Sequence, residues 1–165
     1  WGIVGGKWSR FASFIYAPSN IVRYLKGQGD PLHSVGHNPL GAFSVFAMLS
    51  LLLVQIGTGL ISDDEISAAG PLTKFVSNAT VSLASSYHIT LGKLLVIVLI
   101  VTHVAAIVFY LYKKRENLIK PMLHGDKLLP LATPASADNA TTRALALAIL
   151  LVCAAAVYWL ISLGG

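Results

Sequence analysis

Two histidines, His88 and His103, lie in a long apolar stretch that runs from Tyr87 to Tyr112. The stretch is long enough to cross a bilayer as a helix, because about 20 residues with a rise of 1.5 Å each suffice. An ionisable side chain at membrane depth is costly and marks a functional site. The spacing of fifteen residues advances a helix by about 22 Å and rotates it by about 60° beyond whole turns. Both imidazoles are therefore expected on broadly one face, at two depths.

Neutral imidazole is a common axial ligand of haem iron. The spacing of His88 and His103 therefore predicts one ligand to each of two b-type haems. A pair of structural or proton-relay histidines fits the same spacing, and the spacing leaves both readings open. Lys93 is expected either to extend toward lipid head groups or to pair with an anionic group such as a haem propionate. His37 is expected at the surface or as a capping residue, with contact to a propionate or a quinone head group as the alternative.

The composition is that of an integral membrane protein. Hydrophobic residues make up 55% of the chain, charged residues only 12%, and the mean hydropathy is +0.71. The single cysteine, Cys153, lies in an apolar stretch. Because there is only one, this chain alone cannot form a disulfide framework or a cysteine metal site. In a soluble protein, a net charge of +5 would suggest nucleic-acid binding, but here the basic residues cluster beside apolar spans. No nucleic-acid partner is expected.

Three membrane-spanning helices are predicted, at residues 41–61, 88–112 and 144–163. Asn38 is a good N-cap for the first, and Pro39 suits its first position. Four small or polar residues near the far end of this helix favour helix packing, or a polar contact to a bound group: Gln55, Gly57, Thr58 and Gly59.

The segments between the spans are expected to be short and polar. Residues 13–26 predict an amphipathic helix in the membrane interface, with a packed loop as the alternative. Its expected inward residues are Phe14, Ile15, Ile21, Val22 and Leu25. Residues 62–86 predict a loop with one short helix around 71–81, and residues 128–143 a flexible connector. The domains expected are a membrane domain over 1–127, this connector, and an additional C-terminal helix over 144–165.

The basic residues also predict an orientation. Ten of the twelve Lys and Arg residues lie in residues 1–40 or 113–143. By the positive-inside rule these segments are cytoplasmic, and the 62–86 loop and the C-terminus are periplasmic.

Three runs of sequence carry a resemblance to a known family. They are GHNPLGAFSVFAMLSLLLVQIGTGLISDD, YHITLGKLLVIVLIVTHVAAIVFY and KKRENLIKPMLHGDK. Together with the opening WGIVGGKWSRF, they resemble the bacterial cytochrome b561 family, which includes the b-type cytochrome subunits of nickel-iron hydrogenases. The similarity extends from Trp1 to about Lys127. The fold class implied is an all-α transmembrane bundle, with the three spans as part of a four-helix haem-binding core plus one extra C-terminal helix.

The resemblance implies two b haems, each bound by two histidines, in a protein of the bacterial inner membrane. Such a protein carries electrons between the quinone or quinol pool and a redox partner, such as a c-type cytochrome or a hydrogenase. His88 and His103 match the ligands of the family's fourth helix. The other two ligands belong to the family's first two helices, which this sequence does not contain. We expect them in a longer form of the chain; a separate polypeptide, or a degenerate protein without haem, is the alternative.

The expected function is therefore electron transfer by a membrane dihaem cytochrome b. Iron with two histidine ligands has no open position, so quinone is expected to react at a haem edge. Whether the protein is itself a quinone-linked oxidoreductase stays open. The rival function is that of a non-catalytic membrane anchor or assembly subunit with structural histidines.

Overall fold

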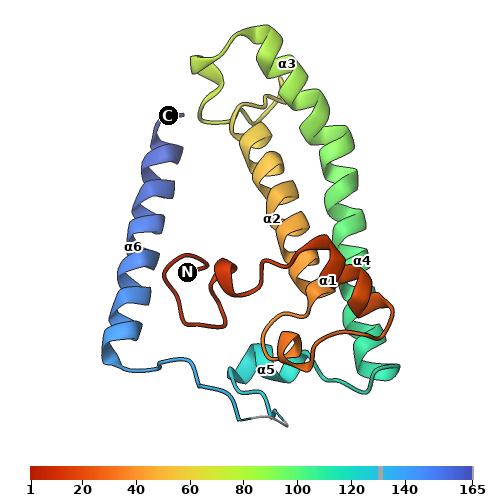
Figure 1. Cartoon of the computed structure of the whole chain (residues 1–165). Helices are drawn as coiled ribbons and strands as arrows, with labels where there is room; N and C mark the ends of the chain where they lie inside the picture. The colour runs from red at the N-terminus through yellow and green to blue at the C-terminus, as the bar shows by residue number, and fades with distance from the viewer. Residues whose placement is uncertain (130–131, 165) are drawn as a thin grey trace. The chain divides into compact units, whose positions relative to one another are not determined.

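The computed structural model describes residues 1–129 and 132–164, and it confirms the predicted all-helical fold (Figure 1). Its α-helices are α1 (Pro18–Leu25), α2 (Pro39–Leu60), α3 (Asn78–Ser86), α4 (Lys93–Tyr112), α5 (Ile119–His124) and α6 (Ala140–Ser162). A π-helical turn, Tyr87–Gly92, joins α3 to α4, and 3-10 turns occur at Phe11–Ser13, Pro31–Ser34 and Thr73–Phe75.

Three helices are long and apolar enough to cross a membrane, as predicted: Pro39–Leu60, Asn78–Tyr112 and Ala140–Ser162. Their large apolar side chains are mostly exposed, for example Leu53 at 69%, Val101 at 63% and Trp159 at 63%. Side chains of this kind belong in contact with lipid or with other apolar helices, because water would solvate them poorly.

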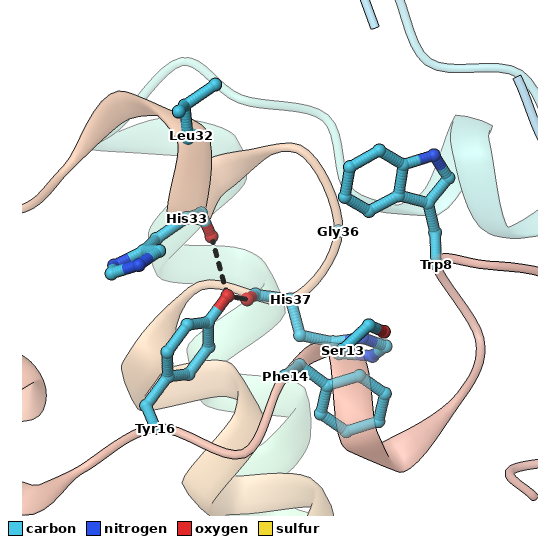
Figure 2. A pocket seen from close by; sticks show the side chains of 8 residues that line it. All are labelled: Trp8, Ser13, Phe14, Tyr16, Leu32, His33, Gly36 and His37. Carbon is cyan, nitrogen blue, oxygen red and sulfur yellow. Dashed lines mark hydrogen bonds between the residues drawn. The ribbon is translucent and has the colours of Figure 1, made fainter. Parts of the chain in front are cut away.

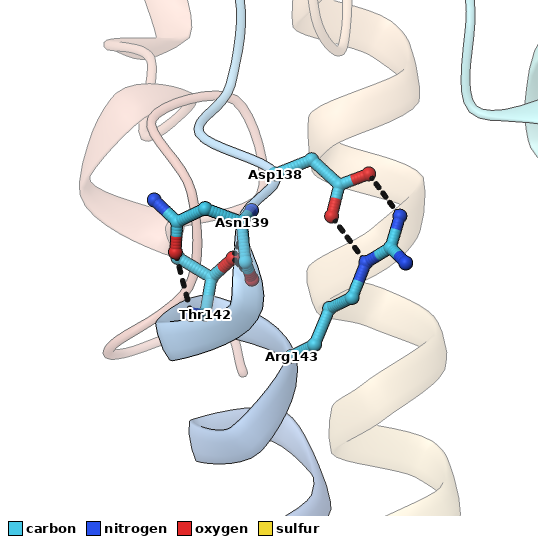
Figure 3. Close-up of polar contacts among 4 residues, drawn as sticks. All are labelled: Asp138, Asn139, Thr142 and Arg143. Carbon is cyan, nitrogen blue, oxygen red and sulfur yellow. Dashed lines mark hydrogen bonds and ion pairs between the residues drawn. The ribbon is translucent and has the colours of Figure 1, made fainter.

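The helix starts follow from capping side chains. Asn38 Oδ1 accepts the main-chain N–H of Gly41 at 2.8 Å, which confirms it as the cap of α2. The second span begins ten residues earlier than predicted because the Ser77 side chain caps α3. The third begins four residues earlier than predicted because Asn139 and Thr142 form a capping box there. Figure 3 shows this box beside the ion pair between Asp138 and Arg143, with Arg143 Nε 2.7 Å from the carboxylate.

The chain divides into two compact units, residues 1–49 with 132–165 and residues 50–131. In the first unit, an aromatic cluster forms the core. Phe14 is 4% exposed. The centroid of its ring lies 4.5 Å from the ring centroid of His37 and 5.6 Å from that of Phe46. Ala42 on α2 is 2% exposed, so this cluster packs at the beginning of α2.

The N-terminal segment differs from the predicted interface helix over residues 13–26. The helix α1 begins only at Pro18, because proline is favoured at a first helical position, and it ends before Gly27, whose φ is +74°. Ile15 is 68% exposed and Leu25 64%, so they do not point into the unit. Of the expected inward residues, Phe14 is buried and Ile21 is half-buried.

In the second unit, the loop after α2 folds back onto the end of that helix. The N–H of Leu72 donates to the carbonyl of Leu60 at 2.9 Å, and the N–H of Gly70 donates to the carbonyl of Ser62 at 2.7 Å. The bond from Leu72 satisfies a carbonyl that the end of a helix leaves without a partner. The N–H of Asp63 donates to Ser85 Oγ at 2.9 Å, which ties the loop to α3. The end of α2 and α3 therefore lie side by side and run antiparallel (Figure 1).

Candidate functional site

His88 lies in the π-helical turn Tyr87–Gly92 of the second span. Turns of this kind are rare and occur frequently at functional sites, because they change which way a side chain leaves the helix. The half-buried His88 ring faces the end of α2, where it lies against Gln55, Thr58 and Gly59.

Hydrogen bonds fix the tautomer of this imidazole. His88 Nδ1 lies 2.9 Å from the main-chain carbonyl oxygen of Gln55. A carbonyl oxygen only accepts, so Nδ1 carries the proton and Nε2 carries the lone pair. Thr58 Oγ1 lies 3.3 Å from Nδ1 and donates its own proton to the Val54 carbonyl at 2.8 Å, so it too faces Nδ1 as an acceptor. The nitrogen available to a metal is therefore Nε2.

The side chain of Gln55 contacts the same histidine. Its amide nitrogen donates to the main-chain carbonyl of His88 at 3.2 Å and lies 3.5 Å from His88 Nε2. An amide donor beside Nε2 agrees with a lone pair on that nitrogen. Gln55 thus contacts His88 with both its main chain and its side chain.

Two glycines allow this close approach of the helices. A Cβ at Gly59 would lie 2.7 Å from His88 Cε1, and a Cβ at Gly92 would lie only 2.0 Å from Gln55 Oε1. By contrast, a Cβ at Gly57 would meet no atom within 4 Å. Of the small residues near the end of α2, Gly59 has a packing role within the second unit and Gly57 has none there.

A cavity of about 300 Å³ opens beside His88 at the end of α2. The loop of residues 62–70 forms most of its wall, with two carboxylates among the lining residues. The residues that line it are Gly59, Ser62, Asp63, Asp64, Ala68, Ala69, Gly70, His88 and Ile89. Backbone N–H groups hold the pKa of Asp64 well below its usual range, so this carboxylate is charged at neutral pH.

His103 and Lys93 lie farther along the same span and are both exposed. The main-chain N–H of Lys93 donates to the carbonyl of His88 at the end of the π turn, but no hydrogen bond joins the Lys93 or His103 side chain to the His88 ring among the residues that the structure describes. A π turn holds about one residue more than an α turn, so the fifteen residues from His88 to His103 rotate about as far as fourteen α-helical residues. The two positions therefore lie within about 40° of one another around the helix, and about 20 Å apart along it. Lys93 forms no ion pair with the residues that the structure describes.

His37 lies in the first unit, in the wall of a different cavity (Figure 2). This cavity has a volume of about 150 Å³. Its lining is aromatic and imidazole-rich: Trp8, Ser13, Phe14, Tyr16, Leu32, His33, Gly36 and His37. The Tyr16 hydroxyl donates to the main-chain carbonyl of His37 at 3.0 Å. Burial, and then the Asp30 carboxylate, raise the pKa of Tyr16, so its hydroxyl stays protonated and remains a donor.

The donor chemistry at His88 fits a haem. A histidine that binds iron characteristically donates its other ring N–H to a carbonyl or carboxylate, which fixes the ring and makes it a better ligand. His88 donates its Nδ1–H to the carbonyl of Gln55, so the lone pair that a metal would need is on Nε2, which lies 3.5 Å from the Gln55 amide nitrogen. No group of three or more histidine, cysteine or acidic residues that could hold a metal ion occurs among the described residues. Haem ligation does not need such a group, because a single nitrogen binds on each side of the porphyrin.

Only part of this site could be predicted from the amino-acid sequence. It singled out His88 and the polar end of the first span, but it did not pair Gln55 with His88 or predict the π turn. The signal that was present is a glutamine in a 21-residue stretch, 41–61, that carries no charge. A polar side chain in such a stretch has to find a partner on a neighbouring helix.

One comparison with known proteins finds a match. The family model described as prokaryotic cytochrome b561 matches residues 7–125, which is most of the chain and includes His37, His88, Lys93 and His103. No curated protein and no solved structure matches the chain. The chain belongs to the prokaryotic cytochrome b561 family, a family of multi-pass membrane proteins in which b-type haem transfers electrons.

Proposed function

We propose that this chain contributes one histidine ligand to each of two b haems in a cytochrome that transfers electrons between the quinone pool and a redox partner. His88 is the ligand near one membrane surface, and His103 is the ligand deeper in the same helix. The observation that carries the proposal is the hydrogen bond of 2.9 Å between His88 Nδ1 and the Gln55 carbonyl, which leaves the lone pair of the ring on Nε2.

The position of His103 supports the second half of the proposal. It lies within about 40° of His88 around the helix and about 20 Å along it, which is the separation that two cofactors stacked across a bilayer would need. An exposed histidine in an apolar membrane span is costly unless a partner covers it. Iron held by a second helix would be such a partner.

The remaining ligands are proposed to come from helices other than these three spans. The chain has five histidines, and His33, His37 and His124 lie outside the three candidate spans. A haem bound between two helices needs one nitrogen from each of them. The chain would therefore form one wall of each haem pocket, and partner helices would form the other.

When bound, b haem supplies reversible one-electron chemistry between ferric and ferrous iron. Because His88 and His103 would each hold one iron together with a histidine of another helix, a quinone would react at the edge of a haem and not at iron. Lys93 is proposed to pair with a propionate, since it forms no ion pair with the described residues and directly follows the π turn that carries His88. His37 is proposed to contact a propionate or a quinone head group, from the aromatic cavity of the first unit.

The site also has a proposed orientation in the membrane. The basic segments 1–40 and 113–143 are assigned to the cytoplasm, and the acidic loop 62–86 to the periplasm. His88 and its cavity would then lie near the periplasmic surface, and the cavity that includes His37 near the cytoplasmic one.

The test is haem content in three single variants, measured as the b-type α-band in a reduced-minus-oxidised spectrum. His88→Ala and His103→Ala should each remove about one of two haems, because each deletes one ligand of one iron. His124→Ala is the matched control, since His124 is an exposed histidine in α5 outside the spans. It should keep both haems.

Two results would contradict the proposal. The first is a purified wild-type protein without a b-type α-band. The second is full haem content in both His88→Ala and His103→Ala. Size-exclusion elution and helical circular dichroism of each variant separate loss of a ligand from loss of the fold.

A further inference from the structure

The side chain of Gln55 has an unusual environment for a polar group in an apolar helix. Its amide nitrogen donates to the His88 carbonyl, but its Oε1 is buried and has no hydrogen-bond partner among the residues that the structure describes. A buried acceptor without a partner is unfavourable, so the side chain is not placed there by its own hydrogen bonds alone.

Gly92 is what makes room for this amide. Gln55 Oε1 lies where a Cβ of Gly92 would stand, at 2.0 Å from that position. Gly92 itself is buried at the end of the π turn that carries His88. The amide is therefore confined between Gly92 on one side and the main chain and ring of His88 on the other.

We propose that Gln55 is a positioning residue for His88, and the proposal rests on His88 being a haem ligand. Its main-chain carbonyl sets the Nδ1–H tautomer, and its side-chain amide, seated against Gly92, sets the rotation of the imidazole ring. The amide N–H lies on the Nε2 side of the ring, so its positive end faces the nitrogen that binds iron.

This arrangement has an electrochemical consequence. The positive end of a dipole beside an iron ligand favours the ferrous form, which carries one positive charge less than the ferric form. Gln55 should therefore raise the midpoint potential of the haem that His88 binds, and should leave the other haem unaffected. A side chain with only a packing role would not act on one potential.

The experiment compares Gln55→Leu with the wild-type protein by redox titration and by electron paramagnetic resonance of the ferric haems. Leucine removes the amide and keeps the main-chain carbonyl, so His88 still has its Nδ1 acceptor. The expected result is a lower midpoint potential and a shifted largest g-value for the haem that His88→Ala removes. The matched control is Gln28→Leu, which changes the other glutamine of the chain, in an exposed loop.

A second variant moves the amide without removing it. In Gly92→Ala the new methyl group would displace Gln55 Oε1, which is the end of a flexible side chain and can yield. The midpoint potential of the same haem should shift in the same direction as in Gln55→Leu. Gly57→Ala, where a methyl group meets open space in the second unit, should change the midpoint potential of neither haem.

Each outcome either supports or overturns the role of Gln55 as a positioning residue for His88. Selective loss of the His88 haem from Gln55→Leu, with the other haem kept, would also support positioning of His88. Unchanged potentials and g-values in both variants would overturn the inference, and so would loss of both haems from Gln55→Leu, since that indicates a role in the fold as a whole. If His88→Ala keeps both haems, the proposed function itself is wrong, a failure that His88→Ala reveals independently of the Gln55 variants.

Discussion

A single carboxylate, Asp64, organises the loop that forms much of the wall of the cavity beside His88. Its oxygens accept the main-chain N–H groups of Ile66, Ser67 and Ala68 at 3.0, 2.8 and 2.9 Å, and the Ser67 hydroxyl at 3.1 Å. Such bonds favour the ionised form, which is why the pKa of Asp64 is depressed, with the Ala68 bond as the largest cause. The loop depends on this charge for its shape.

Asp64→Ala should loosen the loop, because three main-chain N–H groups lose their acceptor. We expect hydrogen exchange at residues 66–68 to become roughly tenfold faster, measured by mass spectrometry of the purified protein. Asp64→Asn should have a smaller effect, since its carbonyl oxygen still accepts. Glu65→Gln is the control, because no hydrogen bond of the Glu65 side chain occurs in the described structure. Equal exchange in Asp64→Ala and wild type would show that the turn does not need the carboxylate.

The pH dependence of the same loop follows from the direction of the shift. A carboxyl group whose pKa is lowered by folding adds stability above its unfolded pKa, about 3.9, and that stability is lost as the pH falls through the folded value. The wild-type loop should therefore keep its order at neutral pH and lose it only under strongly acidic conditions. In Asp64→Asn the order should not depend on pH in this range, as followed by NMR shifts of residues 66–68.

At the scale of the elements, the end of α2 and the second span are held together by close contact at glycine. A Cβ at Gly59 would lie 2.7 Å from the His88 ring, whereas one at Gly57, two residues away on the same helix, would meet open space within the second unit. Alanine substitutions at these two positions therefore distinguish the effect of the close contact from the effect of helix propensity.

Gly59→Ala should displace the His88 ring, because the contact is shorter than real Cβ atoms tolerate. Overpacking of this kind typically costs about 1–3 kcal/mol. We expect a lower thermal unfolding temperature and partial loss of the haem that His88 is proposed to bind. Gly57→Ala should be neutral or stabilising by up to about 1 kcal/mol, since alanine is the better helix former. Indistinguishable melting curves and haem content in the two variants would rule out close packing at Gly59.

At the scale of the whole molecule, the distribution of charge predicts how the chain crosses the membrane. Ten of the twelve Lys and Arg residues lie in two segments that must share one side if α2 and the second span both cross. The loop between those spans carries only Lys74 from this set, together with three consecutive acidic residues, 63–65. The positive-inside rule assigns the basic side to the cytoplasm.

Accessibility of introduced cysteines tests this orientation in a Cys153→Ala background. Ile66→Cys, at a position that is 91% exposed, should react with a membrane-impermeant maleimide added to spheroplasts. Gln28→Cys and Lys120→Cys should react only after the membrane is permeabilised. The reverse pattern would invert the orientation, and labelling of all three in sealed spheroplasts would reject it.

The family, the number of spans and the start of α2 could all be predicted from the amino-acid sequence alone. Long apolar runs can only be satisfied across a bilayer, and Asn38 with Pro39 is a local capping signal that needs no distant partner. Two histidines in such a run predict a haem site, with structural or proton-relay histidines as the alternative. These features depend on neighbours in the sequence, so the sequence is sufficient to predict them.

The residues that surround His88 became known only from the three-dimensional fold. Gln55 and His88 are 33 positions apart, and their contact depends on the rotation and register of two helices. Both spans are apolar on every side, so hydrophobic periodicity marks no packing face and the sequence could not set that rotation. The π turn was not predicted either, and in the structure it brings Gly92 against the Gln55 side chain of the first span, a neighbour that is distant in the sequence.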